Sequence, residues 1–251
     1  MGTRVLADNG IAEALLRSLA DGDAEAYLAT HATLLKEAEH SCAWLLESQE
    51  TRNFVKLYRH KSTLRRLLPS TTARRPLHAF RAGIALHGQG VAVPRPQGCL
   101  QLPQGVLLVT DALGQNEHLA GQWPQLSEQG RQDCLAVVAR AVADLHRRGF
   151  SHGDAKWHNL VMVEGDCCFV DLERAQYDGR SQRGQSRDLA RFAVAAEYAG
   201  VRPQQFAGFL QSYSVAGGRD DAAFLATAAA DANAIRRRHR RRYGAQLAPL
   251  L

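Results

Sequence analysis

The stretch HGDAKWHN, His152 to Asn159, carries two charges and two imidazoles between apolar segments. It follows LHRRGFS and precedes two short apolar runs, LVMV and CCFV, which EGD separates. Two four-residue apolar runs around a glycine-containing turn predict a β-hairpin. Asn159 and Asp171 each lie six residues from Gly165. A hairpin centred on Gly165 would therefore place them opposite each other at its open end.

The mouth of this hairpin would gather groups suited to phosphoryl transfer. The amide of Asn159 and the carboxylate of Asp171 offer hard oxygen ligands, which Mg²⁺ accepts together with water and phosphate. The reaction also needs a carboxylate that orients and deprotonates the attacking hydroxyl, and a cation near the transferred group. Asp154 and Lys156 fit these two roles. The alternative is an ordinary polar loop, since Asp, Asn and Gly occur in turns of any protein.

A further lysine lies in the middle of a predicted strand. CAWLLE (Cys42–Glu47) and NFVKLY (Asn53–Tyr58) predict two strands joined by a polar turn. Because strand residues alternate between faces, Lys56 shares a face with Phe54 and Tyr58. Lys56 is therefore a candidate for holding nucleotide phosphates. The alternative is a charge that protects an edge strand from aggregation.

The N-terminal part of the chain mixes helical and strand patterns. Two short helical pieces are expected between Ile11 and Leu35, broken by Asp-Gly-Asp. Further helical segments are expected between residues 62 and 90, and prolines follow them. LLVTDAL, Leu107 to Leu113, predicts one more strand.

The C-terminal part reads as mainly helical. A helix is expected to start at Ser127 and to stop at Gly149, with apolar residues at three-to-four spacing. No strand is expected after Val170. This division predicts an α+β fold with a boundary near residues 111 to 114, giving an N-terminal lobe of residues 1–111 and a C-terminal lobe of residues 112–251.

Length and composition narrow the class of protein. The chain has 251 residues, 45% of them hydrophobic, which suffices for one large domain or two lobes. No run of 18 apolar residues occurs, so no transmembrane helix is expected. MGTRVLADNG at the N-terminus does not resemble a signal peptide. An odd number of cysteines without CxxC spacing argues against a disulfide framework or zinc site and favours a reducing cytosol.

The charge of the chain favours an anionic partner. The formal net charge is +6, which suits nucleotides, nucleic acids, acidic membranes or phosphorylated substrates. IRRRHRRRY, Ile235 to Tyr243, holds more arginines than a helix dipole would attract. This segment either contacts an anionic surface or forms a solvated helix face. Nucleic-acid binding is not expected, because no matching fold signal accompanies the arginines.

HGDAKWHN followed by VDLE resembles the catalytic loop and the metal-binding aspartate of the protein-kinase-like fold, H-x-D-x-K-x-x-N followed by a hairpin and Asp. LHRRGFSHGD resembles the helix-to-loop entry of that fold, and FVKLY its lysine-bearing strand. A finer resemblance is to the bacterial lipopolysaccharide inner-core kinases, the Kdo and heptose kinase family. It rests on FVKLYRHKSTLRRLL, AFRAGIALHGQGVAVPRP, HGDAKWHN, VDLERAQ and RDLARF, between about Phe54 and Phe192.

This resemblance implies two lobes, a small antiparallel-sheet lobe and a mainly helical lobe. It implies an ATP- and Mg²⁺-dependent kinase that phosphorylates a sugar hydroxyl of the lipopolysaccharide inner core, with heptose favoured over Kdo. The expected location is cytoplasmic and peripheral on the inner membrane, where basic residues such as Arg236 to Arg242 would hold the glycolipid acceptor or the membrane surface.

The same resemblance assigns roles to residues of this sequence. Asp154 would deprotonate the hydroxyl, and Lys156 would offset charge on the moving phosphoryl group. Lys56 would hold the nucleotide phosphates. The implied magnesium ligands are Asn159 and Asp171. Position alone adds Val109 and Asp111, in the hinge, as nucleotide contacts. Glu173 would be a further contact in the nucleotide site, either to the metal or to Lys56 in place of the missing helix glutamate.

Three departures from the family pattern keep other functions open. No GxGxxG precedes CAWLLE, Ala79 stands where a helix glutamate would pair Lys56, and the segment after Asp171 is short and lacks APE. The short segment favours a small or glycan acceptor over a peptide. The alternatives are a small-molecule kinase of the aminoglycoside phosphotransferase type and an ATP-binding pseudokinase.

Four residues around the loop have structural interpretations. His152 is expected to fix the loop by hydrogen bonding, and Asp188 to anchor the loop backbone or else to be a surface charge at a helix start. Trp157 and His158 are expected either to pack or to contact the acceptor.

Overall fold

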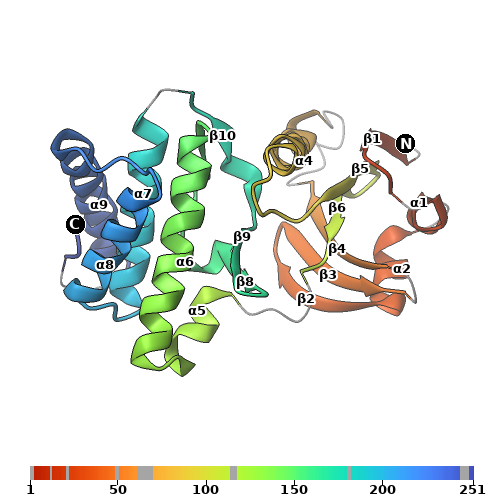
Figure 1. Ribbon diagram of the computed structural model, residues 1–251. Helices are drawn as coiled ribbons and strands as arrows, with labels where there is room; N and C mark the ends of the chain where they lie inside the picture. Colours follow the sequence, from red (N-terminus) through yellow and green to blue (C-terminus); the bar gives the residue numbers. More distant parts are fainter. Residues whose placement is uncertain are drawn as a thin grey trace. The chain divides into compact units, whose positions relative to one another are not determined.

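The computed structural model describes residues 3–11, 13–20, 23–48, 51–60, 70–113, 118–179, 182–243 and 249–251. The chain divides into two compact units (Figure 1). The first comprises Met1–Gly88 with Pro94–Gly114, and the second Gln89–Val93 with Gln115–Leu251. A six-stranded sheet in the first unit and helices in the second confirm the predicted α+β class. The assignment of nucleotide binding to residues 1–111 and of catalysis to residues 112–251 stays a prediction.

The first unit is built on an antiparallel sheet of strand order β1-β5-β6-β4-β3-β2. The predicted strands at residues 42–47, 53–58 and 107–113 are confirmed as β3, β4 and β6, whereas β1, β2 and β5 were not predicted. The sheet comprises β1 (Arg4–Asp8), β2 (Ala32–Ala38), β3 (Ser41–Glu47), β4 (Arg52–Arg59), β5 (Pro96–Leu102) and β6 (Gly105–Asp111).

Two short helices cover one face of this sheet, as predicted. They are α1 (Glu13–Ala20) and α2 (Ala24–His31). Leu19 and Leu28 of these helices are fully buried against alternate residues of the central strands, such as Val55. The expectation that the helical region extends to Leu35 was wrong, because Ala32–Ala38 pairs with β3 as an edge strand. The longer α4 (Ser70–Gly88) packs against β5 and β6.

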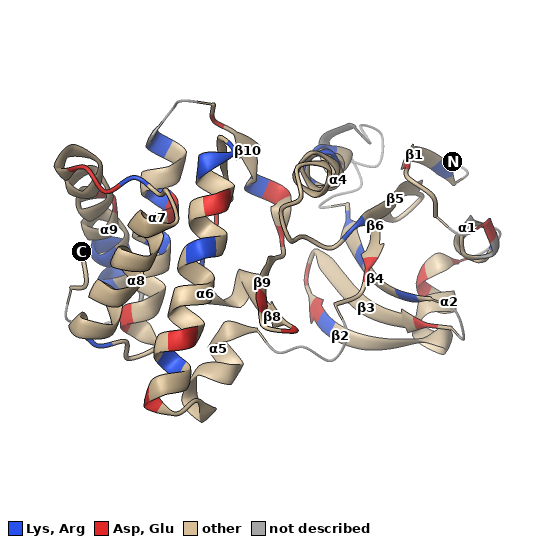
Figure 2. Ribbon diagram, viewed as in Figure 1, with Lys and Arg blue, Asp and Glu red and all other residues tan. Residues whose placement is uncertain are grey.

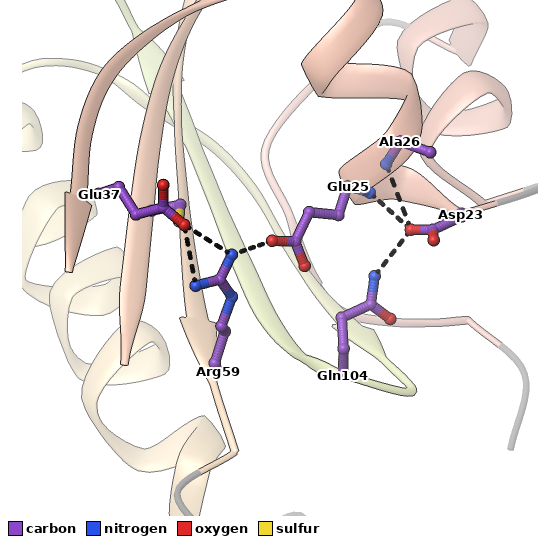
Figure 3. Close-up of polar contacts among 7 residues, drawn as sticks. Asp23, Glu25, Ala26, Glu37, Arg59 and Gln104 are labelled. Carbon is purple, nitrogen blue, oxygen red and sulfur yellow. Dashed lines mark hydrogen bonds and ion pairs between the residues drawn. The ribbon is translucent and has the colours of Figure 1, made fainter. Parts of the chain in front are cut away.

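A polar network fastens α2 to the sheet (Figure 3). The side chain of Asp23 caps α2 by accepting the N–H of Glu25 at 3.0 Å, and Gln104 donates to the same carboxylate oxygen at 3.4 Å. Arg59 of β4 hydrogen-bonds to Glu25 and, at 3.4 Å, to Glu37 of β2. The network fixes α2, which closes the core, and joins this helix to β4 and β2.

The second unit is mainly helical. α6 (Glu128–Arg147) begins as predicted, because Ser127 caps it by accepting the N–H of Gly130 at 3.1 Å. α6 packs against α8, and α7 packs against α9. The other helical segments are α5 (Leu119–Gln122), η1 (Trp123–Gln125), η2 (Trp157–Asn159), η3 (Leu172–Arg174), α7 (Gln182–Tyr198), α8 (Pro203–Val215) and α9 (Ala222–Tyr243).

Two small strand pairs lie among these helices. The predicted hairpin is confirmed as β8 (Leu160–Val163) and β9 (Asp166–Phe169). The expectation of no strand after Val170 was wrong, because β10 (Gln176–Tyr177) pairs with β7 (Phe150–Ser151). Two residues are too few for a sequence pattern to identify a strand. Within the described parts of the chain, no helix has the length and apolar character needed to cross a bilayer.

Candidate active site

Hydrogen bonds from α7 and from the hairpin hold the backbone of the 152–159 loop. The fully buried carboxylate of Asp188 accepts the N–H groups of His152, at 2.5 Å, and Gly153, at 2.9 Å. The His152 ring accepts the N–H of Asp154 at Nδ1 (3.2 Å), which assigns the hydrogen to Nε2, and Nε2 donates to the carbonyl of Val170 at 2.9 Å. The expected anchoring roles of His152 and Asp188 are confirmed.

Gly153 allows the sharp turn that precedes Asp154. Its φ of +74° lies in the region that side chains disfavour. A Cβ at this position would also collide with the carbonyl oxygen of Arg174. The residue before Asp154 therefore has to be glycine, and this backbone geometry fixes where the Asp154 carboxylate lies.

The structure brings Asp154, Lys156 and Asn159 together. Lys156 Nζ donates to Asp154 Oδ2 at 2.8 Å, and Asn159 Nδ2 donates to the same oxygen at 3.2 Å. Asn159 also donates to the main-chain carbonyl of Asp154 at 2.9 Å. On the other side, Arg191 Nε lies 4.0 Å from Asp154 Oδ1. Arg191 was missed by sequence reasoning, although it lies one helical turn beyond Asp188.

The hairpin register differs from the prediction by one residue. Glu164 and Gly165 both have positive φ, 49° and 90°, which is the conformation of a two-residue type I′ turn. The hairpin is therefore centred between these two residues, and not on Gly165. The carbonyl of Asn159 accepts the N–H of Val170 at 3.0 Å, so Asn159 faces Val170 instead of Asp171. Asp171 follows in the left-handed conformation (φ 62°, ψ 56°), which ends the strand.

Asn159 and Asp171 fit the chemistry of a magnesium site. The buried Asn159 uses its Nδ2 for both bonds to Asp154, which leaves its amide oxygen as the atom for a cation. Asp171 is exposed. An amide oxygen and a carboxylate, completed by phosphate and water, form a set of ligands that Mg²⁺ accepts.

Lys56 lies in the interior of the sheet of the first unit. β4 is hydrogen-bonded to β3 on one side and to β6 on the other. The alternative that Lys56 protects an edge strand is therefore wrong. Its Nζ lies 4.9 Å from the ring centroid of Tyr58, which confirms that the two share a face.

The two hinge residues are engaged within the first unit. The Val109 side chain is fully buried in the core, on the opposite face of the sheet from Lys56, whereas its neighbour Leu108 pairs with Lys56. The carboxylate of Asp111 accepts a hydrogen bond from the Gln97 side chain. The side chain of Val109 is thus not available to a nucleotide in this conformation.

The helix after β4 offers no carboxylate for Lys56. α4 contains neither Asp nor Glu in its sequence, and Ala79, which stands at the expected position of the glutamate, is buried. The absence of this glutamate is therefore confirmed for α4. Glu173, the proposed substitute, lies half-buried in η3 of the second unit.

Trp157 packs in the interior of the second unit. It is 1% exposed, meets Trp123 edge-on with ring centroids 4.9 Å apart, and stacks on Phe192 at 5.7 Å. Packing is therefore its role, and not acceptor contact. His158 beside it is exposed.

Basic residues gather on α9 (Figure 2). They comprise a structural residue and exposed ones. Arg236 is 14% exposed and its Nε donates to the fully buried carboxylate of Glu197 at 2.9 Å. The expectation that Arg236 contacts an anionic partner is therefore wrong. Four other residues are exposed: Arg237, Arg238, Arg240 and Arg241. The side chain of Arg242 lies outside the described residues.

Two features define the class of protein-kinase-like folds. One is the antiparallel sheet with its interior lysine, and the other is the anchored loop with its aspartate, lysine and asparagine. A model of the Lipopolysaccharide kinase (Kdo/WaaP) family matches residues 25–213, and the chain belongs to this family. The predicted resemblance is thereby confirmed. Membership supports a kinase, that is, a phosphotransferase, that acts on the lipopolysaccharide core.

Two further comparisons agree with the fold. The structure of WaaP in complex with acyl carrier protein superposes with a TM-score of 0.62 at 22% identity, over 97% of this chain and 100% of that chain. The RIO-type serine/threonine-protein kinase Rio1 of Haloferax volcanii is 30% identical over 86 residues. That match covers 34% of this chain and 28% of the relative, so it concerns a segment only.

Proposed function

We propose that this chain transfers the terminal phosphate of ATP to a sugar hydroxyl of the lipopolysaccharide inner core. Family membership supports the lipopolysaccharide core as the target. The main support for the proposed reaction is the arrangement of Asp154, whose Oδ2 accepts hydrogen bonds from Lys156 and Asn159. One carboxylate oxygen is fixed, and the other remains for the hydroxyl.

In the proposed mechanism, Asp154 orients the acceptor hydroxyl and accepts its proton as the oxygen attacks the terminal phosphate. Lys156, which lies beside the same carboxylate, offsets negative charge that develops on the moving phosphoryl group. Asp188 and His152 keep the loop backbone rigid, so that Asp154 needs no reorganisation during the reaction. The ordered loop is thus the main contribution of the second unit.

Lys56 would hold the phosphates of the nucleotide, in line with its interior position on a strand of the first unit. Asn159 and Asp171 would hold Mg²⁺, with Glu173 as a further contact for the metal. When bound, Mg²⁺ neutralises charge on the phosphates.

The acceptor would be a heptose or Kdo residue of the inner core, presented at the cytoplasmic face of the inner membrane. Support for a membrane contact comes from the exposed arginines of α9, because each basic residue near an anionic bilayer contributes about 1 kcal/mol of binding. Arg236 takes no part in this contact.

Mass spectrometry of the core oligosaccharide from cells with and without this protein tests the proposal. The expected result is a loss of one phosphate, mapped to one sugar, in cells that lack the protein. Identical core structures in both cells would contradict the proposed acceptor and would favour a small-molecule kinase. A panel of aminoglycosides and amino alcohols would then identify that activity.

A second candidate is a pseudokinase that binds ATP and transfers nothing. The family pattern places a glutamate on this helix, and the sequence of α4 contains no carboxylate, which favours this candidate. A wild-type turnover that disappears in Asp154→Asn would exclude this candidate.

A further inference from the structure

Arg191 of α7 lies next to the oxygen of Asp154 that the loop leaves open. Lys156 and Asn159 both donate to Oδ2, and no described residue hydrogen-bonds to Oδ1. Arg191 Nε is 4.0 Å from Oδ1, and the side chains of Arg191 and Asp154 are 26% and 27% exposed. A hydroxyl that donates to Oδ1 would therefore approach beside the guanidinium.

The guanidinium of Arg191 forms an ion pair with Asp154 but donates no hydrogen bond to any described residue. Its contact with Asp154 is its one polar contact there, and the distance is too long for a hydrogen bond. By contrast, Arg236 is also mostly buried but hydrogen-bonds to Glu197. A guanidinium that is three quarters buried normally has its N–H donors hydrogen-bonded, since burying polar groups without hydrogen bonds is costly. The donors of Arg191 are thus available to a ligand.

Neighbouring contacts fix the position of Arg191 on α7. Three residues earlier, Asp188 hydrogen-bonds to the loop backbone. The next residue, Phe192, stacks on the buried Trp157. The backbone of Arg191 is therefore held rigidly against the 152–159 loop on both sides, which favours a binding role that needs a defined geometry.

We propose that Arg191 binds an anionic group on the acceptor sugar, a carboxylate or a phosphate close to the hydroxyl that Asp154 deprotonates. The inference rests on the proposed function and names its substrate class. A hydroxyl oxygen bonded to Oδ1 and an anion bonded to the guanidinium can belong to one sugar residue, because only 4.0 Å separates Oδ1 from Nε.

The chemistry of the guanidinium selects the substrate class. Its planar array of N–H donors matches carboxylate and phosphate in bidentate geometry. A neutral sugar would offer the N–H donors of this guanidinium no charged acceptor. Kdo is itself a sugar acid, whereas a heptose would meet this requirement only with a phosphate already attached. Arg191 thereby discriminates between acidic and neutral acceptors.

Steady-state kinetics of Arg191→Gln test this inference with three acceptors: intact core oligosaccharide, carboxyl-reduced core and phosphatase-treated core. The expected result is a KM for intact core that rises about 10- to 100-fold, the range for a lost hydrogen bond to a charged group. The KM of the wild type should rise by a similar factor for the acceptor that lacks the recognised anion. The KM of Arg191→Gln should be the same for that acceptor as for intact core. The treatment that reproduces the effect identifies the anion as carboxylate or phosphate.

Arg187→Gln is the matched control, because Arg187 lies one turn earlier on α7 and pairs with Asp231 at 3.9 Å. It should leave all KM values unchanged, and Arg191→Lys should restore part of the affinity. If Arg191→Gln raised KM by the same factor for all three acceptors, or changed kcat alone, the inference would be overturned. The proposed kinase activity would not be affected by that result. A wild type that phosphorylates none of the acceptors would overturn the proposed function as well.

Discussion

Replacing Asp188 with asparagine should both destabilise the protein and slow the reaction. The carboxylate accepts two backbone N–H groups, from His152 and Gly153, in a fully buried position. An asparagine has a single acceptor oxygen, and its NH₂ group would face the other N–H. The change removes one bond to a charged acceptor, worth about 1.5–3 kcal/mol, and leaves a buried N–H without a partner at a cost of about 1–3 kcal/mol.

These terms sum to a loss of about 2.5–6 kcal/mol in the free energy of unfolding. In a chain of this size each kcal/mol lowers the unfolding temperature by about 2–4 °C, so a decrease of about 5–24 °C is expected. Displacement of the loop by an ångström would also lower kcat about 100-fold. Thermal unfolding followed by circular dichroism measures the first effect, and single-turnover kinetics measure the second.

Asp133→Asn provides the control, since Asp133 is an exposed carboxylate on α6 that accepts one hydrogen bond, from Gln129. Its unfolding free energy should change by less than about 0.5 kcal/mol. An Asp188→Asn protein that unfolds at the wild-type temperature would refute the reasoning that this carboxylate holds the loop.

Three other predictions follow from the packing of charged groups and thiols. Lys56→Met should raise the KM for ATP about 10-fold or more by removing a charge-assisted bond to phosphate, without lowering the unfolding temperature; nucleotide titration measures the change. Arg236→Met should cost about 3–5 kcal/mol in urea unfolding, because it leaves the Glu197 carboxylate buried without its partner, whereas the exposed Arg238→Met should cost less than about 0.5 kcal/mol. Burial raises the pKa of every cysteine thiol above its ordinary 9.0, so the unfolded chain releases thiol protons that the folded chain retains. The free energy of unfolding should therefore fall as pH rises from about 9 towards 12. Iodoacetamide at pH 8 should label the thiols only after denaturation. The thiols concerned are those of Cys42, Cys99 (pKa about 12), Cys134 (pKa about 11), Cys167 and Cys168 (pKa about 12).

The parts of the fold with strong local patterns could be predicted from the sequence. The strand that carries Lys56 alternates half-buried and buried residues along most of its length, and α6 has a serine cap and regular apolar spacing. β2 escaped prediction because it is an exposed edge strand, and β5 because it begins with proline and contains glycine. Such strands are formed by pairing with their neighbours and not by their own composition.

The candidate site shows the same division. The spacing of Asp154, Lys156 and Asn159 identified the loop because the chemistry itself requires those residue types in that order. The hairpin register was wrong by one residue, since Glu164 shares the positive-φ turn that was assigned to Gly165 alone. Arg191 reaches Asp154 only through the packing of α7, and a sequence pattern contains no information on which helix face meets the loop.

In the proposed function, Asp154 directs phosphate from ATP to a sugar of the lipopolysaccharide core. The most direct measurement is transfer of labelled phosphate from ATP to purified core oligosaccharide by the wild type and by Asp154→Asn. One phosphate per acceptor is expected for the wild type, and a rate lower by a factor of about 100 or more, with unchanged ATP affinity, for the variant. Equal rates for the two proteins, or ATP consumption without labelled acceptor, would contradict it.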